Sequence, residues 1–144
     1  MVSNDTIRLL KECDAGSKMA VASIDDVLER VENSELKGLV QESKDHHAKL
    51  GNEIHSLLNE YGKSEKDPNP MAKGMSKMKT GMKMTMDDSD ATVADLITDG
   101  CNMGIKSLFR YMNQYKAADD TSKDICNRLV SIEEELRKGL RSYL

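Results

Sequence analysis

The sequence predicts an all-α protein, a bundle of four long helices arranged as two helical hairpins. Apolar residues recur at steps of three and four through four long stretches, which is the period of an amphipathic helix. Aromatic residues are scarce, with four Tyr, one Phe and no Trp. A core of aliphatic side chains and Met suits helices better than sheets. The 144 residues fit one domain, 1–144.

A faint internal repeat supports the two-hairpin arrangement. The run at 16–21, Gly-Ser-Lys-Met-Ala-Val, returns 84 residues later at 100–105 as Gly-Cys-Asn-Met-Gly-Ile. Apolar positions of the second stretch return in the fourth at an offset of 86, as in the pairs Leu39 and Ile125, Leu50 and Leu136, Ile54 and Leu140. A helical hairpin used twice requires a connection between its two copies.

The first hairpin is expected to contain helices at about 5–32 and 35–61. Ser3 or Asn4 can cap the first helix. Asn33 can end it in a left-handed conformation, and Ser34 can cap the next helix, so that the pair is antiparallel. The apolar stripes are interrupted near the middle of both helices, and their members are Ile7, Leu10, Ser17, Val21, Ile24, Leu28 and Val31, then Leu36, Val40, Ser43, His47, Leu50, Ile54, Leu57 and Tyr61.

The second hairpin is expected at about 90–116 and 120–143, with Asp88 or Ser89 as the first cap. Gly100 and Gly104 lie on the stripe of its first helix and allow a neighbouring helix to come close. The stripe of the last helix is apolar throughout and comprises Ile125, Leu129, Ile132, Leu136, Leu140 and Tyr143. The segment 62–89 contains the two prolines and is expected to be a partly helical crossover along the bundle.

Composition and missing motifs exclude several classes of function. A net charge of −4 disfavours sequence-independent nucleic-acid binding. No stretch approaches the roughly 20 apolar residues of a membrane span, and residues 1–10 lack the pattern of a signal peptide. Three cysteines without tight spacing favour a reducing cytoplasm over a disulfide framework or a zinc site. No motif of a hydrolase, nucleotide enzyme or transferase is present.

Polar residues in the middle of the stripes are the candidate site. Glu42 and His46 lie one helical turn apart, and His47 lies on the apolar stripe itself. A carboxylate beside a neutral imidazole can bind a divalent metal. The candidate ligands of one such ion are Glu42, His46, His47, Asp14 and Cys101. The alternative is a structural polar layer in which His47 bonds to Ser17, Asp14 or a backbone carbonyl, and in which Cys101 is a buried thiol.

The segment 71–86 is rich in Met and Lys and contains no acidic residue. Its methionines are Met71, Met75, Met78, Met82, Met84 and Met86. They can form one face of a crossover helix that packs on the bundle, bind Cu(I) through their thioethers, or contact a protein partner or an anionic membrane surface. The acidic runs Asp25-Asp26 and Glu133-Glu134-Glu135 are interpreted as solvated faces.

The chain resembles the ferritin-like superfamily, and within it an uncharacterised bacterial branch related in layout to rubrerythrin. The segments that carry the resemblance are 13–17, Cys-Asp-Ala-Gly-Ser, 35–42, Glu-Leu-Lys-Gly-Leu-Val-Gln-Glu, and the Gly100-Cys101 pair. The resemblance implies a ferritin-like four-helix bundle with one long crossover. Metal-binding members hold two irons with a Glu on two helices and a Glu-x-x-His pair on each of the others.

Most of that ligand pattern is missing from this chain. Ser17 and Cys101 occupy the positions of the two single Glu residues, and Glu42 is followed three residues later by Asp45. The last helix has Arg128 and Ser131 at the corresponding offset. A di-iron centre needs several anionic ligands, so we expect a degenerate site without a cofactor. The expected role is non-enzymatic, through self-association or a protein partner; the alternatives are one divalent ion at Glu42, His46 and His47, or Cu(I) at the methionines.

Overall fold

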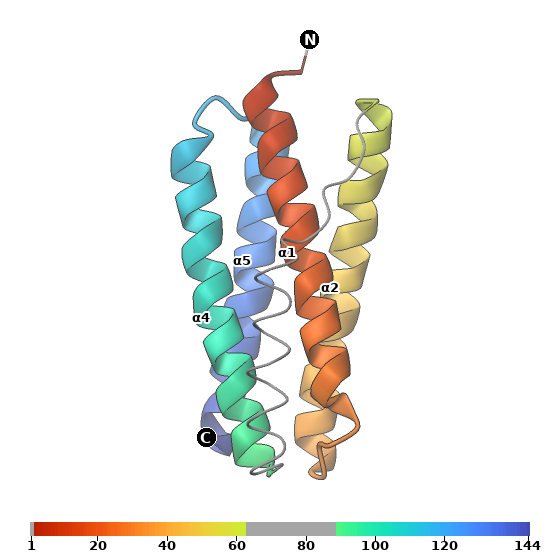
Figure 1. Cartoon of the computed structure of the whole chain (residues 1–144), viewed down its shortest axis with the longest axis vertical. Helices are drawn as coiled ribbons and strands as arrows, with labels where there is room; N and C mark the ends of the chain where they lie inside the picture. The colour runs from red at the N-terminus through yellow and green to blue at the C-terminus, as the bar shows by residue number, and fades with distance from the viewer. Residues whose placement is uncertain (1, 63–88) are drawn as a thin grey trace.

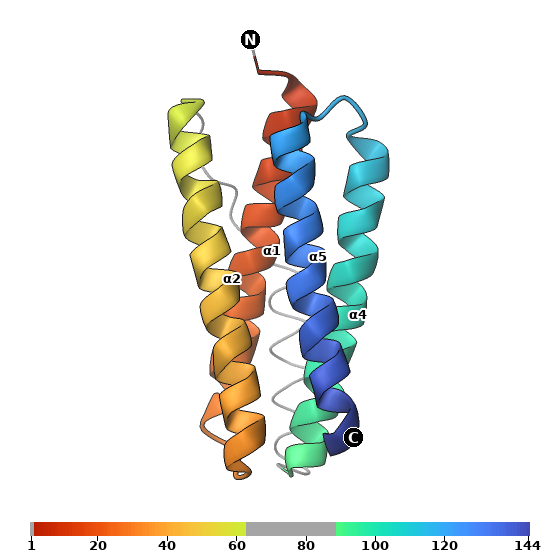
Figure 2. The same cartoon turned by 180° about the vertical axis from the view of Figure 1, so that it is seen from behind.

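The computed structural model describes residues 2–62 and 89–144, and these residues form four long helices (Figures 1 and 2). The helices are α1 (Asn4–Leu28), α2 (Ser34–Glu60), α4 (Asp90–Gln114) and α5 (Asp120–Leu140), and a short 3-10 helix, η1 (Arg141–Tyr143), follows α5. The described part of the chain contains no strand. The predicted all-α class is therefore confirmed.

The helices begin within one residue of their predicted starts but end earlier than predicted. The first helix ends at Leu28 rather than at residue 32, and the expected role of Asn33 is wrong. Asn33 has an extended backbone with φ −70°, and its side chain accepts hydrogen bonds from the N–H groups of Glu35 and Leu36. It therefore caps α2 at the position predicted for Ser34. The backbone N–H groups of Arg30 and Val31 donate to the carbonyl oxygens of Val27 and Leu28, which satisfies these acceptors at the end of α1.

The four helices pack as two antiparallel hairpins around a shared interior. α1 and α5 lie between α4 on one side and α2 on the other, and both central helices contact both outer helices and each other (Figures 1 and 2). α2 and α4 run in the same direction, so α2 ends at the opposite end of the bundle from the start of α4. The predicted crossover belongs between these ends, and its residues 63–88 lie outside the described part.

Side chains at the helix starts join the two hairpins. The Asp90 carboxylate, at the start of α4, accepts hydrogen bonds from the backbone N–H groups of Glu32 and Asn33, at 2.9 and 3.0 Å. At the other end, Asp5 and Thr6 of α1 accept from the backbone of the turn between α4 and α5. Each of the two short turns, between α1 and α2 and between α4 and α5, therefore has two backbone donors satisfied by the opposite hairpin.

The core consists of two apolar clusters, one toward each end of the bundle. Buried positions of the two hairpins correspond at the offsets of the sequence repeat. At an offset of 84 the pairs are Leu9 and Val93, Leu10 and Ala94, Cys13 and Ile97, Ser17 and Cys101, Ile24 and Leu108. At an offset of 86 they include Leu36 and Ser122, Val40 and Cys126, Ser43 and Leu129, His47 and Glu133, Leu50 and Leu136. Equivalent faces of the two hairpins therefore line the interior.

Candidate functional site: a buried polar layer

Four buried polar or thiol side chains near the middle of the bundle come one from each helix. These are Ser17 on α1, His47 on α2, Cys101 on α4 and Glu133 on α5, and we call them the mid-bundle layer. Their exposed fractions are 1%, 0%, 2% and 8%. Cys101 itself belongs to the apolar cluster that contains Leu136, while Leu50, close to His47 in sequence, belongs to the other cluster. The interruptions in the predicted stripes therefore face the interior rather than solvent.

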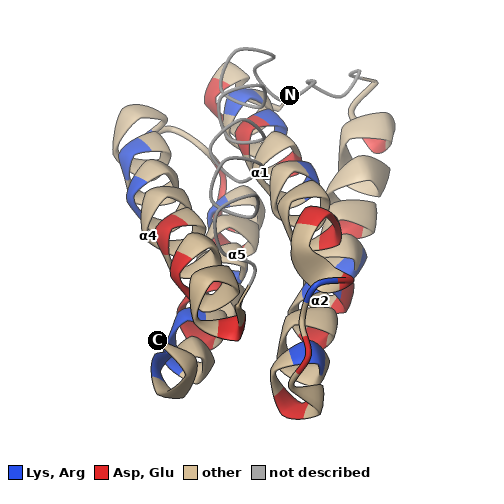
Figure 3. Cartoon of the chain, turned by 60° about the horizontal axis from the view of Figure 1, so that its bottom comes forward, with Lys and Arg blue, Asp and Glu red and all other residues tan. Residues whose placement is uncertain are grey.

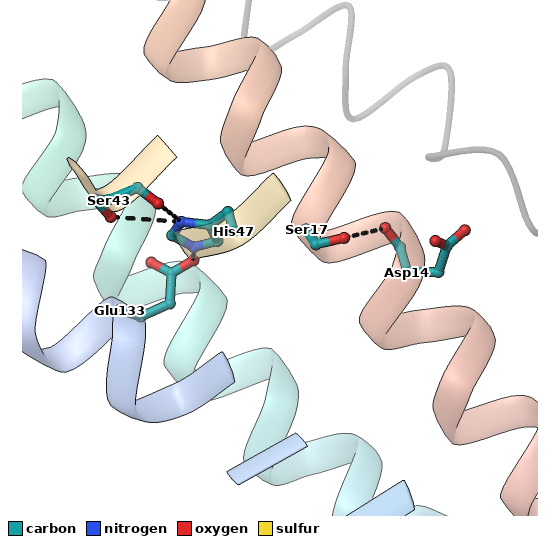
Figure 4. A network of polar contacts seen from close by, with 5 residues as sticks. All are labelled: Asp14, Ser17, Ser43, His47 and Glu133. Carbon is teal, nitrogen blue, oxygen red and sulfur yellow. Dashed lines mark hydrogen bonds and ion pairs between the residues drawn. The ribbon is translucent and has the colours of Figure 1, made fainter. Parts of the chain in front are cut away.

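His47 uses both of its ring nitrogens inside the protein (Figure 4). Nδ1 lies 2.8 Å from the backbone oxygen of Ser43 and 3.4 Å from its Oγ. Because a carbonyl oxygen only accepts, Nδ1 carries a hydrogen and donates it. Nε2 lies 2.9 Å from Oε1 of Glu133, and this hydrogen bond joins α2 to α5. Both nitrogens are thus satisfied by protein groups without water or a ligand.

The Glu133 carboxylate also accepts from the thiol of Cys101. Burial is the main reason why the pKa of this thiol is raised well above its ordinary value, and the negative charge of Glu133 raises it further. The thiol therefore stays protonated at neutral pH and donates to the carboxylate. Helix α4 comes close enough that a Cβ at Gly104 would lie 3.5 Å from the carboxylate carbon of Glu133. Glu133 thereby links three helices.

Ser17 completes the layer without contacting His47 through a hydrogen bond. Its hydroxyl donates to the backbone oxygen of Asp14, at 2.8 Å, within α1. Gly51 of α2 faces this hydroxyl, and a Cβ there would lie 3.1 Å from Oγ of Ser17. The absence of a side chain at Gly51 therefore allows α1 and α2 to approach closely at the layer. A groove of about 460 Å³ between these helices is lined by Asp14, Ser17, His47 and Gly51 among others.

The predicted metal ligands do not come together. Glu42 and His46 are exposed on the outer face of α2, with 3.9 Å between Oε1 and Nε2. Asp14 is 1% exposed, but its carboxylate is turned away from the layer (Figure 4) and lies 3.0 Å from Nζ of Lys18. Of the five candidates only His47 and Cys101 belong to the layer. Within residues 2–62 and 89–144, no three His, Cys, Asp or Glu side chains are grouped so that they could hold a metal ion.

Glu133 is the residue of the layer that the sequence interpretation missed. It was expected on a solvated face with Glu134 and Glu135, and this expectation is wrong because its carboxylate is buried against His47. A signal was present, because position 133 is position 47 plus the repeat offset of 86. The stripe of α5 also passes from Leu129 to Leu136 and includes position 133 at helical spacing.

The comparisons give this chain no relative. No family model, no curated protein and no solved structure matches it. The helices that the structure describes include none that is long and apolar enough to cross a membrane. The methionines of the predicted soft-metal or partner face, Met71, Met75, Met78, Met82, Met84 and Met86, lie outside the described residues.

Proposed function

We propose that this protein is a non-enzymatic helical bundle of ferritin-like descent in which a structural polar layer occupies the place of a di-iron centre. The observation that carries the proposal is the complete internal use of His47, whose two ring nitrogens are bonded to Ser43 and Glu133. An imidazole ligates a metal through a nitrogen lone pair. A metal would have to displace Glu133 or Ser43 from a fully buried ring.

The ferritin-like part of the proposal rests on helix direction and on the position of the layer. Ferritin-like bundles have one long crossover and place inward-facing ligands on all four helices. In this chain α2 and α4 run in the same direction, which requires one long connection between them. The layer also receives one side chain from each helix, but only Glu133 supplies a carboxylate. Ser17 and Cys101 supply a hydroxyl and a protonated thiol instead.

Metal analysis tests the layer directly. The purified protein is incubated with Fe²⁺, Mn²⁺ or Zn²⁺, desalted, and analysed for bound metal per chain. We expect no stoichiometric metal, and no difference between wild type and a His47→Ala variant that remains folded by circular dichroism. One metal ion per chain in the wild type, lost in His47→Ala, would overturn the structural interpretation of the layer.

The rival proposal of a single divalent ion has one observation in its favour, the 3.9 Å approach of Glu42 to His46 on the surface of α2. The variants Glu42→Ala and His46→Ala separate it from the buried layer, because both side chains are exposed and their loss leaves the core intact. Metal that is lost in these variants but kept in His47→Ala would place the ion on the surface. Titration of a peptide spanning 71–86 with Cu(I) tests the remaining alternative.

We further propose that the bundle acts in the cytoplasm through self-association or a protein partner. Two large apolar side chains on α4, Met103 and Phe109, are 66% and 47% exposed. Acidic and basic residues are interspersed along the helices (Figure 3), so charge of one sign does not select the partner. Light scattering across a concentration series should show a mass above that of the monomer that falls in Met103→Ser/Phe109→Ser. A monomer at every concentration would exclude self-association and leave the partner.

A further inference from the structure

Asp14 of α1 is a buried carboxylate whose capacity to accept hydrogen bonds is only partly used. Its side chain is 1% exposed, and the ammonium of Lys18 lies 3.0 Å from Oδ2. The other oxygen, Oδ1, has no hydrogen-bond partner in the described part of the chain. A carboxylate accepts several hydrogen bonds, and a buried acceptor without a donor costs free energy. Asp14 therefore offers a strong, unfilled acceptor inside the protein.

This acceptor lines the groove of about 460 Å³ between α1 and α2. The carboxylate is turned away from the mid-bundle layer (Figure 4), so it is separate from the bond between His47 and Glu133. The hydroxyl of Ser17 lines the same groove. It donates its hydrogen to the backbone of Asp14, which leaves the lone pairs of Oγ as further acceptors. A ligand with several donors would complement this end of the groove.

Small and aliphatic residues form another part of the wall, including Val21 of α1 and Ala48 and Gly51 of α2. The missing side chain at Gly51 gives the groove part of its depth, because a Cβ there would lie 3.1 Å from Oγ of Ser17. Val21 follows Asp14 by two helical turns, or about 10 Å along α1. The groove therefore suits a ligand with a charged donor at one end and a short hydrocarbon chain at the other.

We propose that this groove binds a small primary amine in its protonated form, with the ammonium on Oδ1 of Asp14 and the hydrocarbon chain against Val21 and Ala48. An ammonium has three donors and no acceptor, and its hydrogen bonds to a carboxylate are about twice as strong as those between neutral groups. A metal ion suits Asp14 less well, because residues 2–62 and 89–144 include no group of three His, Cys, Asp or Glu side chains that could hold one. The proposal goes beyond the structural role of the layer and does not depend on it.

Lys18 limits the affinity for a second cation. Its ammonium already pairs with Oδ2 of Asp14 and repels another positive charge nearby. The Lys18 side chain is 40% exposed, so it can turn toward water when an amine binds. Lys18→Met removes this charge and keeps a flexible side chain. We expect this variant to bind the amine at least about threefold more tightly than the wild type does.

Titration of the folded full-length chain with n-butylammonium chloride, at constant ionic strength, tests the proposal. Calorimetry gives the dissociation constant, which we expect to be on the order of 1 mM for so small a ligand. Amide shifts in ¹H–¹⁵N NMR spectra should be concentrated in α1 and α2 around the groove. Three probes should each bind at least about tenfold more weakly: n-butanol lacks the charge, tetramethylammonium lacks N–H donors, and methylammonium lacks the hydrocarbon chain.

Two variants test the position of the ligand. Asp14→Asn removes the carboxylate and should weaken binding at least about tenfold. Ala48→Leu places a larger side chain at an exposed position on the groove wall and should weaken binding without disturbing the core. Asp26→Asn is the matched control, because it removes the same charge from an exposed position on α1. It should leave the dissociation constant within about twofold. If Asp14→Asn does not fold, Ala48→Leu and the three probes decide.

Several results would overturn the proposal. These are no saturable binding of n-butylammonium below about 10 mM, equal binding of n-butanol or tetramethylammonium, equal weakening by Asp14→Asn and Asp26→Asn, and amide shifts centred on other helices. Each is independent of the metal analysis, because the amine site uses Oδ1 of Asp14 and leaves the bonds of His47 in place. An amine site can therefore fail while the structural interpretation of the layer holds, and the reverse.

Discussion

Removing the Glu133 carboxylate should strongly destabilise the bundle. In Glu133→Ala, the His47 Nε2 loses its partner at 2.9 Å while the ring stays fully buried. The Cys101 thiol loses its acceptor in the same step. Breaking one member of a buried hydrogen-bonded pair costs about 3 kcal/mol of unfolding free energy, more than a typical surface substitution. For a chain of this size that corresponds to a fall of about 10 °C in melting temperature.

The matched control removes both members. In His47→Leu/Glu133→Leu, apolar side chains of similar volume replace the pair, so no imidazole or carboxylate is left buried without a partner. The Cys101 thiol, a weak donor, loses its acceptor here as it does in Glu133→Ala. We expect this double variant to lie within about 1 kcal/mol of wild type. Urea unfolding followed by circular dichroism at 222 nm measures all three proteins. The explanation based on an orphaned imidazole would be refuted if Glu133→Ala were no less stable than the double variant.

Three further predictions concern positions away from the layer. Gly38→Ala should stabilise the protein by about 0.5–1 kcal/mol, because it raises helix propensity where a Cβ meets nothing within 4 Å. Gly139→Ala should leave the protein about 1 kcal/mol less stable to unfolding than Gly38→Ala does, because overpacking is unfavourable. The new Cβ at position 139 would lie 2.8 Å from Cδ1 of Leu39. Equal melting temperatures of the two variants would contradict this. The pKa of Glu53 is lowered by its hydrogen bonds to Arg128, so the stability from this exposed pair is present above the unfolded pKa and lost as pH falls through the folded one. Glu53→Gln should cost less than about 1 kcal/mol at neutral pH, and urea midpoints of the variant and wild type should converge in acid.

The helical framework could be predicted because each helix carries its own information. The stripe spacing identifies all four helices and includes His47. Which of His46 and His47 faces the interior was left open by the sequence, and the structure buries His47 while His46 is exposed. Caps are also local, although Asn33 rather than Ser34 performs the capping of α2. The early end of α1 was less predictable, because residues 29–32 have helical composition and the turn is stabilised by Asp90, which is distant in sequence.

The composition of the layer could be predicted only in part. The bond from His47 to a backbone carbonyl was among the expected alternatives, because the acceptor lies one turn away on the same helix. The bond to Glu133 depends on how α2 is aligned along α5, and no local pattern specifies that alignment. The sequence around Glu133 also led to the wrong prediction for this residue, because three consecutive acidic residues are typical of an exposed face. Only Glu133 of the three faces the core.

The correspondence of His47 with Glu133 has a consequence for how the halves recognise each other. Residues at equivalent places in two similar hairpins touch only where an approximate two-fold axis passes between them. A hairpin that met a second copy of itself there would set imidazole against imidazole, or carboxylate against carboxylate, away from water. Those mismatches disfavour like-with-like dimers. The acid–base contact between the unlike halves thus favours pairing of the two hairpins of one chain over pairing of identical hairpins from two chains.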